Sequence, residues 1–304
     1  MSKQSAVNFI GNTLVALSFV FIVNRLFKYN LDLTGILTNC LLTTIAICTI
    51  VYSILVIAHA YTFCHILNLI HGTPLPQGNS VYTFCKTNLY KYLPGNIFHY
   101  VGRNKIAVDE QIPHSTVMIA TFTDILFLVS AAVAVALVFT GQSTAFWFKQ
   151  ISNGHWTVIT VILLIAVSVL VLILRRFTAA LKSIIERVNL KDTVKVTGVY
   201  MLIFIFNGLI LSWILREVGV DISKNVFIYK IIGAYSVSWI IGFLTPGAPG
   251  GIGVREAVIS LLLKGSATSI DLIIIAVVIT RIVSIMGDIM GVLIANRIRI
   301  LKNQ

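Results

Sequence analysis

Two matched interruptions in an otherwise apolar sequence limit the folds that are open to this chain. Pro94-Gly95 is followed by Arg103 and Pro246-Gly247 by Arg255, so each arginine stands nine residues after its proline. Proline and glycine break membrane helices, and arginine is costly in lipid unless it faces protein or a polar cavity. Two such elements in one chain predict a site that is built inside the bilayer.

The composition is that of a membrane protein. Hydrophobic residues make up 57% of the 304 residues and charged residues only 11%, and the mean hydropathy is +0.93. These values are too apolar for a soluble domain. Six stretches approach or exceed the roughly 20 apolar residues that a spanning helix needs: 7–27, 36–58, 115–139, 156–174, 194–215 and 271–295. The first has no small-residue cleavage pattern after it, so we expect it to be retained.

The basic residues predict the orientation of the chain. Its net charge is +12, but the positive residues lie in short loops and beside apolar spans. That distribution argues against nucleic-acid binding and for membrane topology. The most basic loop, 175–195, and the tail 297–302 are placed in the cytoplasm by the positive-inside rule, which leaves the loop 140–155 outside.

Two shorter segments, 80–108 and 227–264, must then begin and end on one side of the membrane, the first in the cytoplasm and the second outside. Each is interrupted at its proline. An arm of about 13 residues covers about 20 Å of a core of about 30 Å. We predict an all-α integral membrane protein, a single polytopic domain over 1–304, with about six transmembrane helices and two re-entrant helical hairpins. The hairpins form part of an inverted repeat with halves of about 36–139 and 194–295.

The breaks themselves predict an anion site. A helix that starts at such a break directs its N-terminus, with unpaired N–H groups and a positive dipole, toward the apex of the hairpin. Arginine adds a full charge and binds phosphate in a bidentate fork. The alternative is that the prolines only kink helices and the arginines extend to the membrane surface. The predicted substrate-binding residues are Lys91, Pro94, Gly95, Asn96, Arg103, Gly250, Gly251, Gly253, Arg255 and Glu256.

Three further ionisable residues lie inside predicted spans: Asp124, Arg281 and Asp288. Charges inside a span face the protein interior and find partners. We expect Asp124 or Asp288 to pair with Arg255 or Arg281. Glu256 follows Arg255 directly and points about 100° away from it on a helix, so it needs another partner. The sequence leaves open whether these are fixed structural pairs or pairs that exchange during substrate passage.

The sequence contains none of the common enzyme or metal-binding motifs that we looked for. The chain has no G-x-S-x-G, H-E-x-x-H or phosphate-binding glycine loop. Its four cysteines include no C-x-x-C pair and its six histidines are scattered. We therefore predict no catalytic set, no metal and no cofactor. The acidic pair Asp109-Glu110 fits a solvated cytoplasmic loop better than the active site of a glycosyltransferase.

The segments around the two breaks resemble a known family. They read Lys91-Tyr92-Leu93-Pro94-Gly95-Asn96-Ile97-Phe98-His99-Tyr100-Val101-Gly102-Arg103 and Pro249-Gly250-Gly251-Ile252-Gly253-Val254-Arg255-Glu256-Ala257. They look like the two signature stretches of the lysylphosphatidylglycerol synthase transmembrane (flippase-like) family. The resemblance implies a protein of a bacterial or archaeal inner membrane that moves anionic phospholipids or polyprenyl-phosphate-linked glycans between leaflets. Synthases of that family carry an additional soluble aminoacyl-transferase domain. This sequence stops at Gln304 after its last span, so we do not expect aminoacyl transfer.

Three functions remain in view. The first is a translocator that holds an anionic headgroup between the two hairpins. The second is a membrane enzyme that uses Asp124, Asp288 or Glu256 as acid or base. The third is an accessory subunit of cell-envelope lipid or polysaccharide synthesis, with a glycosyltransferase as partner. We favour the first, because arginine together with helix N-termini accounts for both motifs, while no complete set of acid, base and nucleophile is visible.

Overall fold

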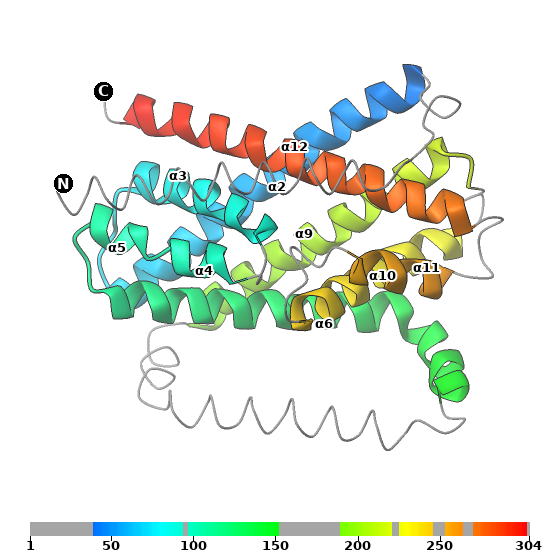
Figure 1. Ribbon diagram of the computed structural model, residues 1–304. Coiled ribbons are helices and arrows are strands. Elements are labelled where there is room, and N and C mark those ends of the chain that lie inside the picture. The colour runs from blue at the N-terminus through cyan, green and yellow to red at the C-terminus, as the bar shows by residue number, and fades with distance from the viewer. Residues whose placement is uncertain are drawn as a thin grey trace.

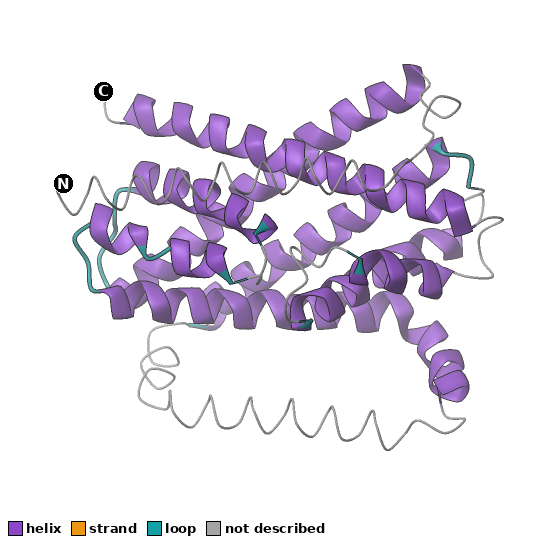
Figure 2. Ribbon diagram, in the orientation of Figure 1, coloured by secondary structure: helices purple, strands orange, loops and turns teal. Residues whose placement is uncertain are grey.

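The computed structural model describes residues 39–93, 97–151, 189–220, 225–245, 253–263 and 270–302, and every element in these ranges is helical (Figure 2). The predicted spans 7–27 and 156–174 lie outside the described residues. Both Pro-Gly breaks, at Pro94-Gly95 and Pro246-Gly247, also lie outside them.

The described chain repeats one order of elements twice: a long helix, an interrupted segment and another long helix. In the first half these are α2 (Asn39–His71), then α3 (Gln77–Asn88), the 3₁₀ helix η1 (Leu89–Tyr92), α4 (Phe98–Gly102) and α5 (Lys105–Asp109), then α6 (His114–Ile151). In the second half they are α9 (Leu190–Glu217), then α10 (Asn225–Leu244) and α11 (Val254–Leu263), then α12 (Ile270–Lys302). We call α3 to α5 the first broken segment and α10 to α11 the second.

Four of the long helices are long and apolar enough to cross a membrane: Asn39–His71, His114–Phe139, Leu190–Glu217 and Asp271–Leu301. Their outward faces carry large apolar side chains such as Ile54, Leu137 and Leu293, each more than half exposed. A soluble protein would not leave such faces to water. The chain is therefore an integral membrane protein, as the composition predicted.

The lengths of the helices differ from the sequence-based expectation in three places. Helix α2 continues 13 residues beyond the expected end at residue 58, because the polar residues that follow, such as His59 and His65, bond to other helices. Helix α6 continues to Ile151, so the loop expected from residue 140 is helical over 140–151. Helix α10 has 20 residues rather than about 13, and at 1.5 Å per residue it reaches about 30 Å. In the second broken segment, α11 has only 10 residues and is too short to cross.

Helices α2 and α12 cross closely in the upper part of Figure 1. Gly287 and Gly291 of α12 make that approach possible, because a Cβ on Gly287 would lie 2.5 Å from Tyr52 and one on Gly291 3.2 Å from Val56. Small residues four apart are the usual contact surface of closely packed membrane helices. The crossing brings α12, with Arg281 and Asp288, against the middle of α2.

The two broken segments lie at opposite ends of the bundle. In Figure 1 the first is at the left, where α12 and the chain end, and the second is at the right. Each has its own apolar core. Phe63, Phe84 and Ile106 belong to the cluster around the first segment, and Leu211, Ile231 and Ile279 to the cluster around the second. Helices α2 and α9 contribute to both clusters, which ties the two ends together.

Candidate functional site

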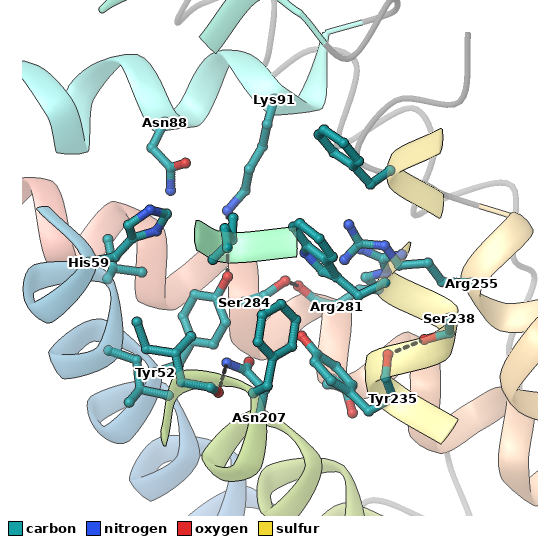
Figure 3. Close-up of a pocket in the computed structure, with 18 of the residues that line it drawn as sticks. Tyr52, His59, Asn88, Lys91, Asn207, Tyr235, Ser238, Arg255, Arg281 and Ser284 are labelled. Atoms are coloured by element: carbon teal, nitrogen blue, oxygen red, sulfur yellow. Dashed lines mark hydrogen bonds between the residues drawn. The ribbon is translucent and has the colours of Figure 1, made fainter. Parts of the chain in front are cut away.

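A cavity of about 150 Å³ lies between the two broken segments and is also lined by α2, α6, α9 and α12 (Figure 3). We call it the central cavity. Four cationic side chains line it, Lys91, Arg103, Arg255 and Arg281, and none of the described residues that line it is acidic. Neutral polar groups complete the wall: Tyr52, His59, Asn88, Tyr92, His99, Tyr100, Asn207, Tyr235, Ser238, Thr280 and Ser284. Such a lining attracts an anion.

Arg103 follows α4 and is almost fully buried, at 2% exposure. Its Nη1 donates to Asp124 Oδ2 on α6 at 2.7 Å, and its guanidinium lies 4.2 Å from the ring centre of Phe84. Asp124 also accepts from Tyr200 of α9 and lies 3.3 Å from His59 Nε2 of α2. The charge of Arg103 is thus matched by a carboxylate, and the pair joins the first broken segment to three long helices.

Lys91, in the 3₁₀ helix η1 of the first broken segment, is also paired with a carboxylate. Its Nζ lies 2.7 Å from Asp288 Oδ2 of α12, and Figure 3 shows the side chain reaching down into the cavity. Asp288 is fully buried and accepts from Tyr92 Oη at 2.6 Å and from Asn88 Nδ2 at 2.9 Å. A buried carboxylate with three donors is well satisfied. This cluster joins the first broken segment to the second half of the chain.

Glu256 explains where α11 begins. It is the third helical residue after Gly253, and its Oε2 accepts from the Gly253 N–H at 2.6 Å, as a glutamate does in a capping box. Its other oxygen accepts from Arg281 Nε of α12 at 3.0 Å. Glu256 therefore fixes the N-terminus of α11, and with it the position of Arg255, while it neutralises Arg281.

Arg255 differs from the other three cations, because it forms no ion pair with any described residue. Its Nε is buried and has no hydrogen-bond partner in the described part of the chain. The side chain lies against Gly242, where a Cβ would be 2.7 Å from Arg255 Cγ, and its guanidinium is 5.8 Å from the ring centre of Trp239. Arg255 is partly buried, and a cation that is partly removed from water without a counterion carries a cost in free energy.

His99 offers a second unsatisfied polar group to the cavity. It is 7% exposed, and its Nδ1 has no partner among the described residues. Burial, together with the nearby charge of Arg103, lowers the pKa of His99 well below its usual range, so the ring is neutral. A neutral imidazole gives a ligand a hydrogen bond without adding charge.

An aromatic wall stands beside Arg255. Trp239 and Phe243 of α10 stack with ring centres 5.3 Å apart and planes 3° from parallel. Tyr100 of α4 meets Phe243 edge to face at 6.4 Å, so the wall bridges the two broken segments. Aromatic rings next to cations suit a guest with both a charged and an apolar part.

The structure brings together four of the cations that the sequence singled out, including Lys91, Arg103 and Arg255 of the predicted binding set. Gly253 and Glu256 support the site from behind and are not among the lining residues. Pro94, Gly95, Asn96, Gly250 and Gly251 lie outside the described residues.

The expected ion pairs were wrong in their partners. We expected Asp124 or Asp288 to bind Arg255 or Arg281, but Asp124 binds Arg103 and Asp288 binds Lys91. The reason is that the first broken segment packs against α6 and α12, which brings its own cations within reach of both carboxylates. Glu256 does take a partner other than Arg255, as its helical direction predicted.

The acidic pair at the end of α5 is not the solvated loop that we expected. Asp109 accepts from Thr83 Oγ1 at 3.1 Å and from Lys105 Nζ at 2.7 Å, and Glu110 accepts from Ser80 Oγ at 3.3 Å. Burial raises the pKa of Glu110 above its usual range. Both carboxylates hold α5 against α3 and lie away from the cavity.

Sequence reasoning missed most of the neutral cavity residues, among them Tyr52, Asn207 and Tyr235. A signal for Asn207 was present, since an amide in the middle of an apolar span rarely faces lipid. Tyr52 and Tyr235 had none, because tyrosine is common in membrane helices. Comparisons of the chain with protein-family models, with curated proteins and with solved structures found no match.

Proposed function

We propose that this protein translocates an anionic lipid, or a lipid-linked glycan with an anionic phosphate, across its membrane. The observation that carries the proposal is Arg255, a cation in the central cavity without a counterion among the described residues. A phosphate group supplies the missing charge and accepts hydrogen bonds from a guanidinium in a bidentate fork.

The position of the cavity supports transport. It lies between segments that approach from opposite ends of the bundle, which we interpret as two re-entrant hairpins of an inverted repeat. Transporters built in this way hold their substrate near the bilayer midplane at the interface of the repeats. A volume of about 150 Å³ fits a headgroup phosphate, while the acyl chains remain in lipid.

The arrangement of the carboxylates argues against the membrane-enzyme alternative. Asp124, Glu256 and Asp288 are each bonded to a cation and none of them lines the cavity. A general acid or base must reach the reacting group directly or through one water. The three carboxylates act better as supports that hold Arg103, Arg281 and Lys91 in place.

The proposal is tested with purified protein in phosphatidylcholine vesicles that contain a trace of fluorescent phosphatidylglycerol. A membrane-impermeant reductant bleaches the label in the outer leaflet only, so translocation appears as loss of the protected half. We expect faster loss with the wild-type protein than with empty vesicles, and a return to the empty-vesicle rate with Arg255→Gln.

The matched control is Arg216→Gln, because Arg216 is exposed at the end of α9 and does not line the cavity. We expect this variant to keep the wild-type rate. A wild-type protein that moves neither labelled phosphatidylglycerol nor a labelled polyprenyl phosphate would overturn the proposal, and so would Arg255→Gln at full activity.

A further inference from the structure

The charges around the central cavity form a nearly balanced set. Lys91, Arg103, Arg255 and Arg281 line it, and Asp124, Glu256 and Asp288 lie directly behind three of them. Among the described lysine, arginine and carboxylate side chains, four cations and three carboxylates leave one positive charge. The excess belongs to Arg255, the one lining cation that has no ion pair in the described part of the chain.

We infer that the central cavity is matched to a guest with a single negative charge, a phosphodiester, and discriminates against doubly charged phosphomonoesters. The inference deepens the proposed function, on which it rests for the lipid nature of the guest. It names the charge state of the headgroup, which neither the sequence motifs nor the presence of arginines specifies.

The physical reason is the cost of an uncompensated charge among largely buried groups. Asp124 and Asp288 are fully buried and Arg103 is 2% exposed, so water is largely excluded around the pairs. In such surroundings an ion without a partner is strongly disfavoured, whichever sign it carries. A monoanion neutralises Arg255 and leaves no remainder, whereas a dianion replaces an unpaired positive charge by an unpaired negative one.

The unsatisfied hydrogen-bonding groups agree with this guest. Arg255 Nε is a buried donor without a partner, and His99 Nδ1 is a buried polar atom without a partner, both in the described part of the chain. A phosphodiester has two non-bridging oxygens that share its single negative charge and can accept hydrogen bonds, while its two ester oxygens carry the lipid and the headgroup. The wall of Trp239 and Phe243 beside Arg255 then contacts the organic substituents.

The test measures equilibrium binding to the purified protein in a non-ionic detergent at about pH 8, where a phosphomonoester with a second pKa near 6 carries two charges. The probes are short-chain phosphatidylglycerol, phosphatidic acid and phosphatidylcholine, together with dimethyl phosphate, which is a phosphodiester without acyl chains. We expect phosphatidylglycerol to bind at least about tenfold more tightly than phosphatidic acid. Phosphatidylcholine should also bind more weakly than phosphatidylglycerol, because its own choline cation neutralises its phosphodiester.

Two near-isosteric variants change the net charge around the central cavity in opposite directions. Asn207→Asp adds a negative charge to the cavity wall, so we expect it to abolish binding of both anions. Glu256→Gln removes the negative charge that is paired with Arg281 and keeps a side chain that caps α11. We therefore expect the affinity for phosphatidic acid to rise roughly tenfold relative to the affinity for phosphatidylglycerol. Thermal denaturation of each variant shows that it is folded.

The outcomes separate this inference from the proposed function. If phosphatidic acid binds the wild-type protein as tightly as phosphatidylglycerol, the charge match is wrong even where lipid transport occurs. It is also wrong if Glu256→Gln leaves the ratio of the two affinities unchanged and Asn207→Asp leaves the affinity for both anions unchanged. If phosphatidylglycerol binds selectively but does not move between leaflets, the inference stands and the translocator proposal fails. If dimethyl phosphate binds as tightly as phosphatidylglycerol, the guest is a soluble anion and the lipid assignment is wrong.

Discussion

The two broken segments carry the same sequence spacing but use their arginines differently. Arg103, in the first segment, is 2% exposed, bonded to Asp124 and stacked among aromatic rings. Arg255, in the second, has no carboxylate partner among the described residues and lies over Gly242 and Trp239. Arg103 joins several helices through Asp124, and Arg255 is the arginine that we propose binds a ligand. A repeated motif in sequence therefore does not give a repeated role.

The largest effect is expected at Arg103. Arg103→Gln leaves Asp124 buried without its cation, and the loss of one partner from a buried pair costs about 3–5 kcal/mol of stability. Denaturant titration of the purified protein measures it. The double variant Arg103→Gln with Asp124→Asn should recover part of the loss, because no charge is then left unpaired. A single variant as stable as the wild type would erase the contrast between the two arginines.

The same substitution at Arg255 should change ligand binding rather than stability. Arg255→Gln removes a partly buried charge that has no ion-pair partner among the described residues, so we expect stability within about 1 kcal/mol of the wild type or slightly above it. Binding of phosphatidylglycerol should weaken at least tenfold, which corresponds to about 1.4 kcal/mol. Denaturation and binding assays on one preparation separate the two quantities. A large loss of stability with unchanged binding would assign Arg255 a structural role like that of Arg103.

A smaller change sharpens the position of Arg255. Gly242→Ala places a Cβ 2.7 Å from Arg255 Cγ and 2.8 Å from Nε, so the flexible side chain must move. We expect binding to weaken about threefold to tenfold while the fold persists, since alanine favours helix over glycine by about 0.5–1 kcal/mol. Gly198→Ala is the control, because no atom lies within 4 Å of its Cβ position. Equal binding by both variants would show that the position of the guanidinium is not critical.

The smallest effect concerns the start of α11. Glu256→Ala loses both the bond to the Gly253 N–H and the pair with Arg281, whereas Glu256→Gln retains a capping side chain. We expect the alanine variant to be less stable than the glutamine variant by about 1 kcal/mol, which is a typical value for a helix cap. Comparison of their denaturation midpoints measures the difference. Identical midpoints would mean that Glu256 acts only through its charge.

Much of the scaffold was predictable from the sequence. The apolar stretches beginning near residues 36, 115, 194 and 271 predicted four long helices that the structure contains, because length and hydropathy are local properties. The ends were less predictable. Helix α2 extends past residue 58, since His59 and His65 are satisfied by Asp124 and Asp192 on other helices, and no local pattern reveals such partners.

The sequence predicted the cations of the site but not the carboxylates with which they pair. The nine-residue spacing singled out Arg103 and Arg255, and hydropathy singled out Asp124, Arg281 and Asp288. The expected pairing was wrong, because Lys91 and Asp288 stand in opposite halves of the chain and meet only where α3 and η1 pack against α12. Sequence also gave no sign that Tyr52 and Tyr235 face the same cavity.

The sequence by itself determined that the chain is helical, that it belongs in a membrane and that cations stand beside two interruptions, because apolar run length and helix-breaking residues act over a few turns. Only the tertiary structure decided which of the four cavity cations has no carboxylate partner among the described residues. That choice depends on which carboxylates the packed helices bring within reach, since a charge is neutralised by its neighbours in space and not by its neighbours in sequence.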